Sequence, residues 1–214
     1  MRIVVECERL LNMVNERSPL LVYGEAASGK TLMSLAIIKQ LYTRGAINDI
    51  LLVTSEPVST LPAASRILPP RAKILTAFST LDILEYLLEY ALELAKINPR
   101  NIGGCGIVID TLTGPYRVDA SLLPDISTRV LTLTATLINK IAKRYSCTCI
   151  ATSQVHVNPE TRAEEPPAYT LIQEYFDVVL KLQRIDSRRR LVIDEKGNVI
   201  AELLLTTNMV LIKC

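Results

Sequence analysis

The residues best suited to chemistry lie in one stretch near the start of the chain, from Gly24 to Thr31, which reads G-E-A-A-S-G-K-T. This is the G-x-x-x-x-G-K-T pattern of a phosphate-binding loop, or P-loop. An apolar run precedes it at residues 19–23, and an amphipathic segment follows it at residues 32–41. The backbone N–H groups of such a loop converge on a phosphate at the N-terminus of the following helix. The motif therefore predicts a nucleotide phosphate site.

The positions of the motif have separate predicted roles. Lys30 is expected to reach the outer phosphates, and Thr31 to offer its hydroxyl to a bridging Mg²⁺ ion, because that cation takes oxygen ligands. An ordinary glycine-containing turn would not need all four fixed positions of the motif. The expected cofactors are ATP and Mg²⁺. The expected cofactor contacts come from the whole loop, namely Gly24, Glu25, Ala26, Ala27, Ser28, Gly29, Lys30 and Thr31.

Two carboxylates follow apolar runs further along the chain. Asp110 ends the run that begins at Gly106, and Glu56 follows the run Ile50 to Thr54. The carboxyl ends of neighbouring parallel strands open into one crevice. Asp110 is therefore expected to hold Mg²⁺ with Thr31, and Glu56 to orient, or take a proton from, a water that attacks the terminal phosphate. Glu56 would also suit a turn or helix cap, and it is the P-loop that favours the catalytic interpretation.

These residues need a frame that positions them. The chain has 214 residues, 49% of them apolar and 21% charged, which is enough for one globular domain with a substantial core. Strand-like and helix-like segments alternate as far as residue 154, and this predicts an α/β fold around a mainly parallel sheet. Residues 80–96 have helical spacing with an acidic, solvated face. Residues 57–72 are rich in proline and small side chains, and we expect a loop with room for a short helix.

The last third of the chain departs from this alternation. Strand-like segments follow one another through tight turns, at residues 175–183, 189–193, 199–205 and 209–213. They predict an antiparallel extension of the sheet. The first turn carries the densest basic cluster of the chain, and both a solvated hairpin and a phosphate or DNA contact are compatible with it. The cluster consists of Arg184, Arg188, Arg189 and Arg190.

Composition limits the other classes of function. The net charge of +2 does not by itself indicate a nucleic-acid-binding protein. The five cysteines contain no C-x-x-C, which argues against a zinc cluster and against a fully paired disulfide framework. We expect Cys147 and Cys149 to pack as small apolar residues on one face of a strand, and the fold to need neither a disulfide nor a metal. Charges interrupt residues 1–8, and no apolar run approaches the roughly 18 residues of a membrane span, so a cytoplasmic location is expected.

Two further stretches resemble the ATPase core of RecA-type recombinases, and more closely archaeal RadA and its short RadB-type paralogues. Residues 110–119 read D-T-L-T-G-P-Y-R-V-D, similar to the family's D-S-x-x-x-x-Y-R, and residues 152–155 read T-S-Q-V, similar to its T-N-Q-V. The resemblance runs from about Leu11 to the end of the chain. It implies a RecA-like P-loop NTPase fold with an antiparallel C-terminal extension. The whole chain, residues 1–214, would form a single domain with no separate N-terminal DNA-binding domain.

The resemblance also implies roles and partners. Glu56 matches the glutamate that positions the hydrolytic water, and Gln154 matches the glutamine that senses the terminal phosphate. The loops at residues 112–125 and 156–168 match the segments that contact single-stranded DNA. Implied partners are single-stranded DNA and a RadA-type recombinase or another paralogue, without a membrane, and an oligomer could form through RecA-like subunit packing. Candidate DNA contacts are Arg117, Arg162, Arg184, Arg188, Arg189 and Arg190.

Departures from the family pattern favour a modest activity. Ser153 stands where the recombinases have Asn, and residues 155–168 hold acids and prolines but no glycine. We therefore expect a slow, DNA- or partner-dependent ATPase that modulates a main recombinase in homologous recombination and DNA repair. Two alternatives are open, a nucleotide-gated binding module with negligible turnover and a KaiC-like signalling ATPase or kinase without a DNA role. Pro57 stands where the KaiC-like family has a second glutamate, which counts against the last.

Overall fold

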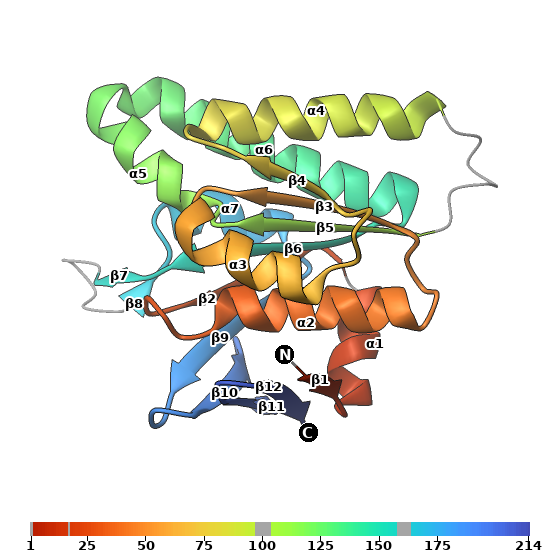
Figure 1. Ribbon diagram of the computed structural model, residues 1–214. Helices are drawn as coiled ribbons and strands as arrows, with labels where there is room; N and C mark the ends of the chain where they lie inside the picture. The colour runs from red at the N-terminus through yellow and green to blue at the C-terminus, as the bar shows by residue number, and fades with distance from the viewer. Residues whose placement is uncertain (1, 17, 97–103, 158–163) are drawn as a thin grey trace.

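A computed structural model describes residues 2–16, 18–96, 104–157 and 164–214. Its centre is a ten-stranded sheet in the order β1-β12-β11-β10-β9-β2-β6-β5-β3-β4 (Figure 1). One half of the sheet is parallel and the other mostly antiparallel. None of the described helices is both long and apolar enough to cross a membrane. The predicted α/β class with a mostly parallel centre and an antiparallel C-terminal region is confirmed.

The parallel half holds the strands that the sequence predicted from apolar runs. Every residue of β5 is buried, as is every residue of β3 after Asp49, because helices cover both faces of the sheet. The carboxyl ends of these parallel strands meet at one edge of the sheet. The strands are β2 (Leu20–Gly24), β3 (Asp49–Thr54), β4 (Lys73–Thr76), β5 (Cys105–Asp110) and β6 (Thr148–Gln154).

Helices cover the two faces through separate apolar clusters. On one face α2 (Lys30–Thr43) and α3 (Pro57–Ile67) pack on the sheet with α1 (Glu8–Glu16), and Leu35 and Ile38 belong to that cluster. On the other face lie α4 (Thr80–Lys96) and α6 (Pro124–Tyr145), as Figure 1 shows. The prediction of a helix at residues 80–96 is confirmed.

Two segments are more helical than expected. The proline-rich stretch after Glu56 forms α3, whose first residue is Pro57. Proline is favourable at the first position of a helix, because a backbone N–H there would have no partner within the helix. The segment at residues 112–125, expected to be a loop, forms α5 (Thr113–Leu122) and the start of α6. That expectation was wrong.

The antiparallel extension comprises β9 (Val178–Arg184), β10 (Arg189–Asp194), β11 (Val199–Leu205) and β12 (Met209–Lys213). β9 joins it to the parallel half by pairing with β2. The outermost strand is β1 (Arg2–Val5), which pairs in parallel with β12 and was not foreseen from the sequence. After β6 come two short strands, β7 (His156–Val157) and β8 (Glu164–Glu165), then α7 (Tyr169–Ile172) and a 3₁₀ turn, η2 (Gln173–Tyr175).

Four of the five cysteines are paired. Disulfides join Cys7 to Cys214 and Cys105 to Cys147, while Cys149 is a free, buried thiol. The expectation that Cys147 packs beside Cys149 as an unpaired residue was therefore wrong. The first disulfide connects the segment before α1 to the last residue of the chain, and the second links the start of β5 to the residue before β6.

Candidate nucleotide-binding site

The P-loop lies between the end of β2 and the start of α2, as the motif predicts. Gly29, immediately before α2, has φ 98° in the left-handed region, which favours glycine. A Cβ atom built on Gly29 would lie 2.7 Å from Cδ1 of Leu205, so the leucine side chain would have to move to admit one. Gly29 thus allows the turn from which α2 begins, and the N-terminal end of α2 is where a phosphate is expected to bind.

Lys30 lies in this loop with only 5% of its surface exposed. Its Nζ donates to the carbonyl oxygens of Gly24 at 2.9 Å and Glu25 at 2.7 Å. Burial lowers the pKa of Lys30, while the carboxylates of Asp110 and Glu56 act in the opposite direction. The ammonium group is therefore held across the loop by neutral carbonyls, where the charged oxygens of a phosphate would be stronger acceptors.

Asp110 is 1% exposed at the end of β5. The hydroxyl of Thr31 donates to its carboxylate, with 2.9 Å to Oδ2 and 3.0 Å to Oδ1. This contact joins two predicted metal ligands that are 79 positions apart. A hydroxyl and a carboxylate supply the oxygen ligands that Mg²⁺ prefers. The residues present therefore fit the expected cation.

Two further hydroxyls satisfy the same carboxylate, and neither was predicted. Thr60 on α3 donates to Oδ2 of Asp110 at 2.6 Å, and Thr152 on β6 donates to Oδ1 at 2.7 Å. Both threonines are fully buried. Thr152 could have been found from the sequence, because it lies in the strand that ends in Gln154. Thr60 could be placed only by recognising that the residues after Glu56 form a helix.

Glu56 and Gln154 meet at the same edge of the sheet. Nε2 of Gln154 donates to Oε1 of Glu56 at 2.7 Å, and the hydroxyl of Ser59 lies 3.4 Å from Oε2. Both residues line an open cleft of about 600 Å³ together with Phe78, Gly114 and Arg117. The structure therefore brings together every predicted residue of the reaction centre, with a solvent-accessible carboxylate beside the P-loop lysine and the buried aspartate.

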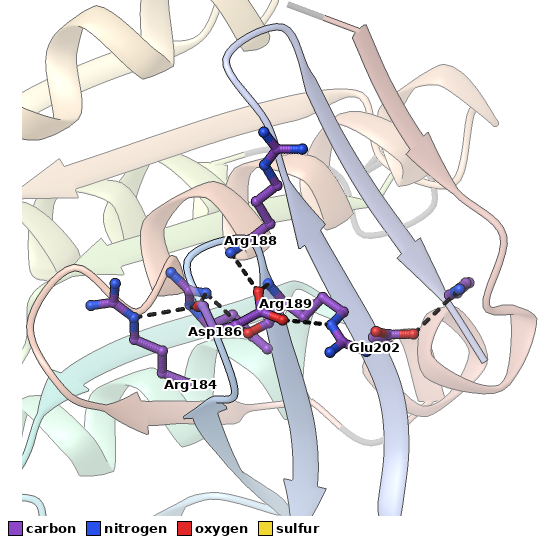
Figure 2. Close-up of polar contacts among 7 residues, drawn as sticks. Arg184, Asp186, Arg188, Arg189 and Glu202 are labelled. Carbon is purple, nitrogen blue, oxygen red and sulfur yellow. Dashed lines mark hydrogen bonds and ion pairs between the residues drawn. The ribbon is translucent and has the colours of Figure 1, made fainter.

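The predicted DNA contacts do not lie together in the structure. Arg117 is exposed in the cleft beside Glu56. Arg184, Arg188 and Arg189 are exposed at the turn between β9 and β10. All three bond Asp186, Arg184 and Arg189 through side-chain nitrogens and Arg188 through its backbone N–H, while the side chain of Arg188 points away (Figure 2). Arg162 lies outside the described residues.

Arg190 does not fit the prediction of a DNA contact. Its exposed fraction is only 4%, and its Nε donates to the carbonyl oxygen of Ser28 in the P-loop at 3.0 Å. Its register in β10 turns the side chain toward the P-loop, away from the surface that Arg188 and Arg189 occupy. A buried guanidinium bonded to the backbone is not available to a polyanion outside.

Comparison of the sequence with protein-family models finds no match, and comparison with curated proteins finds no similar protein. The interpretation of the site therefore depends on its own residues and geometry.

Proposed function

We propose that this chain is a RecA-like ATPase that binds ATP with Mg²⁺ and hydrolyses it slowly. The contact between Thr31 and Asp110 is the observation that carries the proposal. It joins the last residue of a complete P-loop to a buried carboxylate at the end of β5, a parallel strand separated from β2 by β6. P-loop NTPases need such a pair of oxygen ligands for their metal.

Each residue of the reaction centre has a distinct task in this proposal. The N–H groups of the P-loop and the Lys30 ammonium bind the phosphates and stabilise charge on the transferring phosphoryl group. Thr31 and Asp110 would hold Mg²⁺, which neutralises phosphate charge when bound. Glu56 orients the attacking water and accepts its proton, since its carboxylate is partly exposed and borders the open cleft. Gln154, bonded to Glu56, connects this centre to the segment that follows β6.

We further propose a role in DNA recombination and repair, as a RadA paralogue of RadB type that binds single-stranded DNA or modulates a main recombinase. The resemblance in residues 110–119 and 152–155 supports it. Arg117 lies in the same cleft as Glu56 and Gln154, so an anionic strand there would be adjacent to the reaction centre. The exposed arginines at the β9–β10 turn provide a second basic surface.

The test is steady-state phosphate release from Mg·ATP, with and without single-stranded DNA. Three proteins are compared, namely wild type, Lys30→Ala and the matched control Lys39→Ala on the same helix. We expect low turnover in wild type and in the control, none in Lys30→Ala, and a change of at least about threefold when DNA is added. Turnover in Lys30→Ala equal to wild type would refute the ATPase assignment.

The remaining outcomes separate the alternatives. Hydrolysis that is indifferent to DNA would refute the DNA role of the isolated chain, and transfer of labelled phosphate to protein would then support a KaiC-like kinase. Tight binding of Mg·ATP without turnover above the Lys30→Ala background would support the nucleotide-gated binding module.

A further inference from the structure

Near the start of β10, Arg190 carries a guanidinium group in an unusual position. Arginine is rarely buried unless it is paired, yet Arg190 is 4% exposed. Its bonding partners are backbone carbonyl oxygens. Nε donates to Ser28 at 3.0 Å, and one terminal nitrogen donates to Asp186 at 2.6 Å and to Arg189 at 3.0 Å. Arg190 thus connects the β9–β10 turn to the P-loop across 162 positions of sequence.

The carbonyl of Ser28 belongs to a peptide group at the centre of the phosphate-binding loop. A trans peptide group is planar, and its C=O and N–H point in opposite directions. Fixing the carbonyl of Ser28 against Arg190 therefore fixes the direction of the N–H of Gly29, which points away from the guanidinium. A bond from a charged donor also polarises the peptide group, which makes that N–H a better donor to an anion.

Other residues of the antiparallel extension support the loop from the same side. Cδ1 of Leu205 and Cδ2 of Leu203 lie 2.7 Å and 3.4 Å from the place that a Cβ on Gly29 would take. The carbonyl oxygen of Leu182 would meet a Cβ on Gly24. β9, β10 and β11 thus all contribute contacts to the P-loop. The P-loop therefore packs against these three strands, and Arg190 adds a hydrogen bond that has a defined direction.

Asp186 organises the β9–β10 turn, which lies directly before Arg190. Its Oδ1 accepts the backbone N–H groups of Arg188 and Arg189, each at 2.8 Å, and its Oδ2 accepts Nε of Arg189 at 2.7 Å (Figure 2). The same residue offers its carbonyl oxygen to Arg190. The carboxylate therefore fixes the turn, and the turn presents its carbonyls to the buried guanidinium.

We propose that Arg190 is a positioning residue of the phosphate site, which orients the Ser28–Gly29 peptide group so that the P-loop is preformed for a phosphate. The expected effect of Arg190 on nucleotide affinity rests on the proposed nucleotide-binding function. Its structural part, the ordering of the P-loop by Arg190, stands without nucleotide.

Three variants of the full chain test this. Arg190→Gln removes the charge and most of the donors, and Arg190→Lys keeps the charge but has a single nitrogen that cannot reproduce the fork of bonds. Arg44→Gln is the matched control, because Arg44 makes two side-chain hydrogen bonds to Glu8 at the far end of α2 from the P-loop. Two quantities are measured, the affinity for a fluorescent Mg·ATP analogue and the hydrogen exchange of peptides covering residues 24–31 without nucleotide.

We expect Arg190→Gln to weaken nucleotide binding about tenfold and to accelerate exchange in the P-loop by a similar factor, the size expected for a lost charge-assisted hydrogen bond. Arg190→Lys should recover part of both effects, and Arg44→Gln should match wild type. Where Arg190→Gln does not fold, the comparison of Arg190→Lys with wild type decides. Unchanged P-loop exchange, or a lower melting temperature without loss of affinity in the folded protein, would overturn the proposal. If wild type itself does not bind Mg·ATP, the proposed function fails, and the exchange measurement still decides whether Arg190 orders the loop.

Discussion

Nε2 of Gln154 donates a hydrogen bond of 2.7 Å to Oε1 of Glu56, although the two residues are 98 positions apart. The bond occupies one oxygen of the carboxylate that would orient the attacking water. A terminal phosphate beside Lys30 would compete for the same amide donor, since charged phosphate oxygens are strong acceptors. Nucleotide binding would then release Glu56 for catalysis and move the start of the segment after β6.

The first prediction concerns Glu56→Gln. The amide keeps the shape of the side chain but cannot accept a proton from water, so turnover should fall about 100-fold or more. Affinity for Mg·ATP should stay within about threefold, because the phosphates are bound by the P-loop. Single-turnover hydrolysis and equilibrium binding measure the two quantities. An equal loss of affinity and turnover would show that Glu56 binds the nucleotide instead of acting on water.

The second prediction concerns Gln154→Ala, which removes the only described side-chain link between Glu56 and β6. We expect affinity for Mg·ATP to be retained and the effect of single-stranded DNA on turnover to disappear, because the amide no longer reports the phosphate to the following segment. Gln40→Ala on α2 is the control and should respond to DNA as wild type does. A DNA response that survives in Gln154→Ala would contradict the coupling.

The third prediction concerns Thr60→Val, which keeps the shape of a buried side chain but removes one donor to Asp110. A hydrogen bond to a charged group contributes about 1.5–3 kcal/mol, so the variant should lose stability of that order in chemical denaturation. The Mg²⁺ concentration needed for half-maximal turnover should change as well, because Asp110 loses one of three hydroxyls that orient it. Ser65→Ala on the exposed face of α3 should change neither quantity.

The sequence predicted the parts of the site that depend on local pattern. The P-loop needs two glycines, a lysine and a threonine at fixed spacing, and a buried strand ending in Asp110 needs only an apolar run, so both could be located without a structure. Thr60 could not be predicted, because Pro57 and Pro62 made a helix look unfavourable, although the first of them suits the start of one.

The misassigned residues depend on long-range packing. Arg190 looks like its exposed neighbours in sequence, and only the pairing of β10 with β9 and β11 decides that its side chain points toward Ser28. Cys7 and Cys214 are 207 positions apart, and they meet because β1, outside any predicted element, pairs with β12. Sequence periodicity does not predict these contacts, because they depend on which strands pair and in which register.

The fourth prediction concerns the number of reactive thiols. In denaturant without reductant we expect one thiol per chain, that of Cys149, and five after reduction. Mass spectrometry after alkylation measures both values. In Cys149→Ser the unreduced value should be zero. Five thiols in the unreduced wild type would show that neither disulfide forms in the purified protein, and three would show that only one of them does.

The fifth prediction concerns the dependence of stability on pH above neutrality. Burial raises the pKa of the Cys149 thiol to about 12, although a hydrogen bond with Ser18 acts in the opposite direction. In the unfolded chain a cysteine has a pKa of about 8.5. The unfolded state therefore loses its proton first, so the contribution of Cys149 to stability is fully present below about pH 8.5 and is lost as pH rises toward the folded value.

Between pH 7.5 and 9.5 this linkage should remove about 1.4 kcal/mol from the free energy of unfolding, as expected one pH unit above the unfolded pKa. Urea denaturation at each pH measures the change. The matched control is Cys149→Ala, which lacks the thiol, so subtracting its pH dependence cancels the contributions of all other groups. Tyrosine ionisation near pH 10 lies above the window. Equal pH dependence in the two proteins would contradict the prediction, because it would mean that the buried thiol of Cys149 on β6 ionises as easily in the folded chain as in the unfolded one.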